Sequence, residues 1–152
     1  MRKIKSLLLV FVLVLITANL SSCEWAKEYF KTNILGLAEE SKPEGYIESK
    51  ENNLFKYAVC KDGIVITEYI GNDTTVIIPE YLEGKPVISI WSLAFYSNNT
   101  VEYVTLPRTL KRIEASGFYY CNKLKEIEIP DSVTYIGERA FAWCTAMTSV
   151  KL

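Results

Sequence analysis

The feature that most constrains the fold is a period of 23 residues that runs through the C-terminal half of the chain. Steps of this length connect apolar or small residues in six columns: Ile90, Ile113 and Ile136; Ala94, Gly117 and Ala140; Phe95, Phe118 and Phe141; Val101, Leu124 and Met147; Val104, Ile127 and Val150; and Leu106, Ile129 and Leu152. A fixed period in the twenties is typical of a solenoid, in which each repeat buries its apolar side only against its neighbours. The pattern therefore predicts a stack of about three repeats over residues 75–152.

Each repeat is expected to contain a β-strand. In the segment 124–129, Ile127 and Ile129 alternate with Glu126 and Glu128. A period of two places one side of a strand in the core and the other side in solvent. Strands of successive repeats would then lie parallel to one another, about 4.8 Å apart.

The rest of each repeat is expected to return the chain to the start of the next strand. A turn at Pro130-Asp131 leads into a second extended segment, 133–136. Residues 138–144 are expected to form a short helical turn that buries Ala140 and Phe141. The sequence thus predicts a β-rich solenoid with a parallel strand ladder, short helical turns and a phenylalanine column in its core.

Residues 54–74 are predicted to form an N-terminal β-hairpin cap. Leu54–Cys60 and Ile64–Tyr69 have strand-like composition, and Asp62-Gly63 supplies a turn between them. Thr75–Ile78 follows as the first strand of the stack. The hairpin is expected to cover the open end of the stack, as terminal repeats of solenoids do.

Residues 1–22 have the pattern of an export signal helix. Arg2, Lys3 and Lys5 precede the apolar run Leu7–Ile16, and ten helical residues span only about half of a ~30 Å hydrocarbon core. The run ends in Leu20-Ser21-Ser22-Cys23, which resembles the bacterial lipobox. We therefore expect lipidation at Cys23 and a membrane anchor in the bacterial cell envelope; the alternatives are an ordinary signal peptide or an uncleaved anchor.

Residues 23–53 are predicted to form a lipidated tether. Apolar residues recur at helical spacing within Glu24–Glu40, which favours a short helix. Such a helix would lie on the lipid surface or cap the repeat stack, and a frayed tether is the third alternative. Residues 41–53 are polar and contain Pro43 and Gly45, so they are expected to form a linker.

Charge and composition exclude several classes of function. The net charge is −1, and removal of three leader cations from 17 Lys and Arg leaves 14 against 18 acidic residues. Nucleic-acid binding is not expected, because it needs a basic face. The chain has no histidine, which removes Ser-His-Asp and Cys-His catalysis and the usual zinc sites. We therefore expect no catalytic activity, no metal and no cofactor.

The repeat resembles a known family, the BspA-type leucine-rich repeat of bacterial surface proteins. The resemblance covers roughly residues 55–152, despite an insertion at Tyr81–Pro86 in the first unit. It is carried by the unit Leu124-x-x-Ile127-x-Ile129-Pro130-x-Ser132-Val133-x-x-Ile136-Gly137-x-x-Ala140-Phe141-x-x-Cys144. The resemblance implies a cell-surface module that binds an extracellular or envelope protein, with a role in adhesion.

The outward side of the strands is the expected ligand-binding surface. Its candidates form two columns: Tyr103, Glu126 and Ser149, and Thr105, Glu128 and Lys151. Leucine-rich repeats commonly bind proteins on this face, although a solvated surface of mixed charge is the alternative for any single residue. A second candidate is an aromatic group on the turn side, for which packing between adjacent turns is favoured: Tyr96, Tyr119, Tyr120 and Trp143.

Two features of the sequence leave alternatives open. Cys121 and Cys144 occupy the same repeat position, at a spacing that would allow a disulfide. Buried free thiols are favoured for this pair. Cys60 is expected in the core of the hairpin. The segment 148–152 is expected to be an edge strand able to pair with another chain. An envelope assembly protein or a truncated repeat array that pairs through this edge is therefore the alternative function.

Overall fold

The computed structural model describes residues 42–152. The expected signal peptide, the Cys23 anchor and the tether up to residue 41 lie outside these described residues. Within them the chain forms strands and turns and no helix. The strands are β1 (Tyr46–Glu51), β2 (Phe55–Cys60), β3 (Ile64–Tyr69), β4 (Thr75–Ile77), β5 (Tyr81–Leu82), β6 (Lys85–Ile90), β7 (Tyr103–Thr105), β8 (Arg112–Ile113), β9 (Glu126–Glu128), β10 (Tyr135–Ile136) and β11 (Ser149–Lys151).

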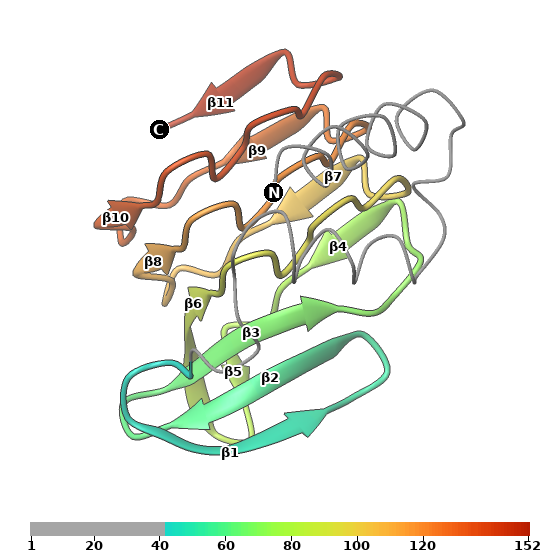
Figure 1. Ribbon diagram of the computed structural model, residues 1–152. Coiled ribbons are helices and arrows are strands. Elements are labelled where there is room, and N and C mark those ends of the chain that lie inside the picture. The colour runs from blue at the N-terminus through green and yellow to red at the C-terminus, as the bar shows by residue number, and fades with distance from the viewer. Residues whose placement is uncertain (1–41) are drawn as a thin grey trace, which may run out of the picture. The chain divides into compact units, whose positions relative to one another are not determined.

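The strands form two sheets, and successive repeats contribute strands to both of them (Figure 1). Sheet A has the order β1-β2-β3-β6-β8-β10, with β5 paired to β6, and sheet B has the order β11-β9-β7-β4. All pairs within sheet B are parallel, and so are the pairs from β3 to β10 in sheet A. The inward residue of each sheet B strand lies beside its counterpart in the next repeat, as in Val104 and Ile127. The predicted parallel ladder and its register are confirmed.

The core contains the predicted file of phenylalanine rings. The ring centroids of Phe95 and Phe118 lie 4.6 Å apart, and those of Phe118 and Phe141 lie 5.3 Å apart. Tyr69 of the N-terminal hairpin extends the file, with its ring 5.2 Å from that of Phe95. Aromatic pairs at these distances add to the free energy gained by burial. The same file of rings therefore connects the hairpin to the repeats.

The prediction of a short helical turn in each repeat is wrong. Two residues in each turn segment have positive φ, at positions that recur every 23 residues: Leu93, Ser116 and Arg139, and Ser97, Tyr120 and Trp143. A left-handed residue ends a helical turn, because continued helix needs negative φ. The freed amides bond to the next repeat instead, as Phe95 N–H does to Gly117 O (2.9 Å) and Phe118 N–H to Ala140 O (2.8 Å).

The N-terminal hairpin is larger than predicted. The β2–β3 pair is antiparallel as expected, but the predicted linker 41–53 contains β1, which pairs antiparallel with β2. The polar composition of β1 conceals this strand, since most of its side chains are exposed. The insertion 81–86 also folds, because Glu83 and Gly84 have φ of 51° and 74° and form the tight turn between β5 and β6.

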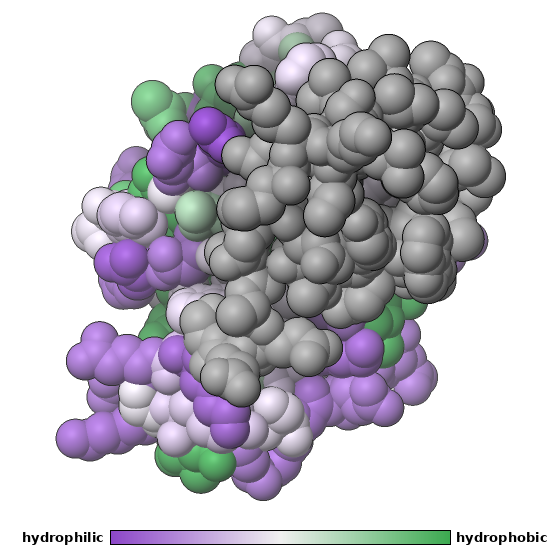
Figure 2. Space-filling view, in the orientation of Figure 1, coloured by the Kyte–Doolittle hydropathy of each residue, from purple (hydrophilic) through white to green (hydrophobic). Residues whose placement is uncertain are grey.

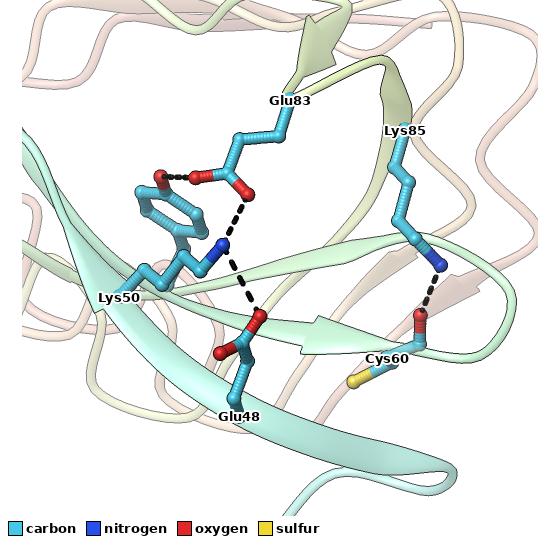
Figure 3. Close-up of polar contacts among 6 residues, drawn as sticks. Glu48, Lys50, Cys60, Glu83 and Lys85 are labelled. Carbon is cyan, nitrogen blue, oxygen red and sulfur yellow. Dashed lines mark hydrogen bonds and ion pairs between the residues drawn. The ribbon is translucent and has the colours of Figure 1, made fainter.

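This turn holds the hairpin against the first repeat (Figure 3). The Glu83 carboxylate accepts hydrogen bonds from Lys50 Nζ at 2.6 Å and from the Tyr57 hydroxyl at 3.0 Å. The Lys50 ammonium is the main cause that lowers the pKa of Glu83. On the other side of the turn, Lys85 Nζ donates to the Cys60 carbonyl at 3.0 Å. The insertion therefore connects the hairpin to the repeat stack through side-chain hydrogen bonds.

We expect Phe118→Ala to lower the free energy of unfolding by about 3–5 kcal/mol, because the mutation removes a fully buried ring that contacts rings on both sides. Urea unfolding followed by circular dichroism measures this loss. Phe141→Ala is the matched control and should cost less, because Phe141 is only half-buried. Equal losses for the two variants would contradict a file of rings that is centred on Phe118.

Candidate functional site

The outward side of sheet B, here called the sheet B face, brings all six predicted ligand-binding residues together. Register pairs Tyr103 with Glu126 and Glu126 with Ser149 in one column, and Thr105 with Glu128 and Glu128 with Lys151 in the other. Alternation along each three-residue strand turns its middle residue inward and its two neighbours outward. The predicted geometry of the face is confirmed, whereas its binding role stays a prediction.

The structure adds two residues that sequence reasoning missed. Thr75 pairs with Tyr103, and Ile77 pairs with Thr105, so the two columns begin one strand earlier. The insertion lengthens the first step from 23 to 28 residues and hides these positions from a fixed period. The alignment of the first strand with the later ones could have identified them. Ile77 matters most, because this apolar residue is 67% exposed.

Ion pairs between neighbouring repeats order the charged side chains on and beside the face. Lys125 Nζ lies 2.7 Å from the Glu102 carboxylate and 5.5 Å from the centroid of the Tyr103 ring. Lys151 forms an ion pair with Glu126. The hydrogen bond from Lys125 lowers the pKa of Glu102, and the bond to Glu126 raises the pKa of Lys151. These contacts hold long side chains across adjacent repeats, so the face is partly ordered before any partner binds.

The sheet B face changes in character along the stack. Its first two strands expose Ile77 and Tyr103, which supply apolar contact area. Its last two strands carry the charged residues Glu126, Glu128 and Lys151. An apolar patch beside charges is an arrangement that fits another protein surface. Within residues 42–152, no group of three His, Cys, Asp or Glu side chains could hold a metal ion, and no helix has the length and hydrophobicity of a membrane span.

The aromatic group on the turn side packs between repeats, as favoured from the sequence. The rings of Tyr96 and Tyr119 stack with centroids 6.0 Å apart, and those of Tyr120 and Trp143 lie 6.2 Å apart. Burial raises the pKa of Tyr96 well above its usual range. The group therefore serves mainly as packing, although Trp143 is 62% exposed.

Two other surfaces frame the site. Over the N-terminal strands, Figure 2 shows a mostly hydrophilic surface in purple. At the other end of the stack, Ile136 and Val150 are each 43% exposed, whereas their counterparts Ile113 and Ile127 are buried. Among the described residues, β10 and β11 are the last strands of sheet A and sheet B. Cys60 is buried as predicted, in a small cluster with Ala58 and Val65, and Cys121 and Cys144 are free thiols.

Residues 71–152, more than half of the 152-residue chain, match the sequence model of the BspA-type leucine-rich repeat region. Among solved structures, a leucine-rich cell surface protein from Faecalibacterium prausnitzii is 27% identical, with a TM-score of 0.61. A leucine-rich repeat protein from Bacteroides ovatus is 28% identical, with a TM-score of 0.57. A third, from Bacteroides capillosus, is 24% identical with a TM-score of 0.50, and supports the fold alone.

These alignments differ in how much of each chain they cover. They include 72% of this chain for the F. prausnitzii protein, 68% for the B. ovatus protein and 69% for the B. capillosus protein. The covered share of those proteins is 32%, 29% and 98%, respectively. The chain thus spans about a third of the first two proteins. A comparison with curated proteins gave no match.

We expect Lys125→Met to raise the pKa of Glu102 toward its ordinary value, because the variant removes the hydrogen bond that lowers it. Carboxyl-resolved NMR titration measures this shift.

The lowered pKa of Glu102 also makes stability depend on pH. Its contribution to the stability of the fold is present above the pKa of Glu102 in the unfolded state and is lost as the pH falls through its pKa in the folded state. An unchanged Glu102 titration in the variant would contradict the ion pair.

Proposed function

Because the chain belongs to the family of BspA-type leucine-rich repeat proteins, we propose that it is a cell-surface module that binds another protein through the sheet B face. The observation that carries the proposal is the array of outward side chains held in register on four parallel strands. The proposal includes no catalytic step, since Glu126 and Glu128 project from the outward side of a solvated sheet, whereas acid catalysis needs a desolvated carboxyl group.

The chemistry of the face defines the partner. The exposed side chains of Ile77 and Tyr103 would meet an apolar patch of the partner, and Glu126 and Glu128 would meet basic side chains beside it. A nucleic acid does not fit, because these carboxylates would repel phosphates. The proposed partner is an extracellular or envelope protein, which makes adhesion the broader role.

The size of the face indicates weak binding by a single copy. Four strands span only about 15 Å across a sheet, whereas a standard interface buries roughly 800 Å² of each partner. Many copies on one membrane would raise the overall affinity by avidity without any new contact. Anchoring through lipid on Cys23 would supply such an array, and more than one acyl chain would make the anchor stable.

A second candidate function rests on β10 and β11, which are the last strands of their sheets within residues 42–152. Strands that have a partner on one side only and expose apolar residues such as Ile136 and Val150 are able to pair with another chain. In this alternative the protein takes part in envelope assembly through its edge strand, and the sheet B face has no ligand. Charge reversal on that face would leave such pairing unchanged.

A photo-crosslinker at Thr105 tests the first candidate in intact cells that produce the protein. We expect a crosslinked partner from position 105 and none from position 51 on the exposed strand β1. The double variant Glu126→Lys/Glu128→Lys should abolish the crosslink, because it places cations where basic groups of the partner bind. Glu51→Lys/Glu80→Lys changes the net charge equally and should retain it. Equal crosslinking by both double variants would refute the sheet B face as the binding site.

Metabolic labelling with a radioactive fatty acid tests the anchor. Wild-type protein should carry the label and sediment with membranes, whereas Cys23→Ala should lose both properties, because the thiol is the proposed attachment atom. Cys60→Ala is the matched control, since this buried thiol should not affect labelling. Label retained on Cys23→Ala would rule out lipidation at this cysteine.

A further inference from the structure

The cysteines of two successive repeats lie next to each other at one end of the turn segment. Backbone bonds hold the two repeats in register on both sides of the pair, from Tyr120 N–H to Ala142 O (2.9 Å) and from Ala146 N–H to Asn122 O (3.2 Å). Neighbouring parallel segments about 4.8 Å apart fall within the Cα separations that a disulfide accepts. Cys121 and Cys144 are therefore positioned to be joined with little movement of the backbone.

The two thiols have equivalent partners but unequal exposure. Cys121 Sγ donates to the carbonyl of Phe95 at 3.0 Å, and Cys144 Sγ donates to the carbonyl of Phe118 at 3.2 Å. Cys121 is 1% exposed, whereas Cys144 is only half-buried. Cys144 is therefore the more accessible of the two thiols to an oxidant in solution.

The contact between the thiols makes them chemically different. As a thiolate, Cys144 can accept a hydrogen bond from the Cys121 thiol, which lowers the pKa of Cys144. The same contact, together with burial, raises the pKa of Cys121 well above its usual value. Burial also raises the pKa of Cys60, which lies in a separate cluster. Since the thiolate is the nucleophile in thiol exchange, accessibility and acidity both favour Cys144.

We propose that Cys144 and Cys121 form an oxidation-sensitive pair, in which Cys144 reacts first and Cys121 then closes a disulfide between two repeats. The oxidant is a low-molecular-weight disulfide. The Cys144 thiolate attacks one sulfur of the oxidant, forms a mixed disulfide and releases one thiolate. Cys121 loses its proton and attacks the Cys144 sulfur, which releases the second thiolate. In total, two protein thiols are oxidised and one small disulfide is reduced to two thiols.

The proposal goes beyond binding on the sheet B face and does not depend on it. The new bond would replace the two S–H···O=C contacts and connect the last repeat, whose apolar residues are partly exposed, to the buried repeat before it. A cross-link of this kind restricts the unfolded chain. Oxidation should therefore raise the thermal unfolding temperature of the stack.

The test is exposure of the reduced full-length protein to oxidised glutathione under native conditions, followed by peptide mapping that distinguishes the four cysteines. We expect loss of free thiol at residues 121 and 144, a disulfide between them and a raised unfolding temperature, with Cys60 still reduced. A stable glutathione adduct on wild-type Cys144, or oxidation at Cys60 before this pair, would overturn the proposal. This readout needs no mutation.

Two variants test the order of the steps. Cys121→Ser should stop the reaction at the mixed disulfide, so that glutathione remains on Cys144. Cys144→Ser should leave Cys121 unmodified in the folded protein, because this thiol is buried. Circular dichroism verifies folding, and Cys121→Ala replaces Cys121→Ser if the latter does not fold. Modification of Cys121 in folded Cys144→Ser would reverse the proposed order and refute it.

Discussion

Stacking of aromatic rings from one repeat to the next is the interaction on which the structure depends. Strands β8 and β10 contain two residues each, and the sheet B strands contain three, so no repeat has enough internal contact to fold alone. The file from Tyr69 through Phe95 and Phe118 to Phe141 supplies the missing apolar contact. Rings stack only when they occupy the same position in successive repeats. The stacked rings therefore also fix the register of the sheet B strands, which aligns the outward columns of side chains.

The parts of this fold that follow from apolar periodicity could be predicted from the sequence, and the parts that depend on distant partners could not. Residues such as Phe118 and Ile127 recur at a fixed step, which identifies the core and both sides of each strand. Strand β1 is mostly polar and is stabilised by its antiparallel partner β2, so its own composition resembles a linker. The left-handed residues Ser116 and Arg139 are neither glycine nor asparagine and carry no signal for a turn.

The candidate site shows the same division. The six outward residues could be placed because their inward neighbours are periodic, whereas Ile77 was hidden by the insertion before the second repeat. The contact between Lys125 and Glu102 joins residues 23 positions apart and depends on rotamers as well as on register. Exposed side chains contact solvent rather than a core, so the identity of a partner is not encoded in the pattern that builds the fold. The sequence therefore predicts the geometry of the face better than it predicts the ligand.

The hydrogen bonds that run from each turn segment to the next repeat have an evolutionary consequence. Phe95 N–H bonds to Gly117 O, and Phe118 N–H bonds in the same way to Ala140 O, so these successive repeats offer their neighbours the same donors and acceptors. A duplication or deletion of one whole unit in the gene would leave each junction chemically equivalent to the one it replaced. A change of one residue in length within a strand would instead turn charged side chains into the core. Such a gene is free to gain or lose whole units, whereas a change of length within a unit is accommodated in a turn, as the insertion at residues 81–86 shows.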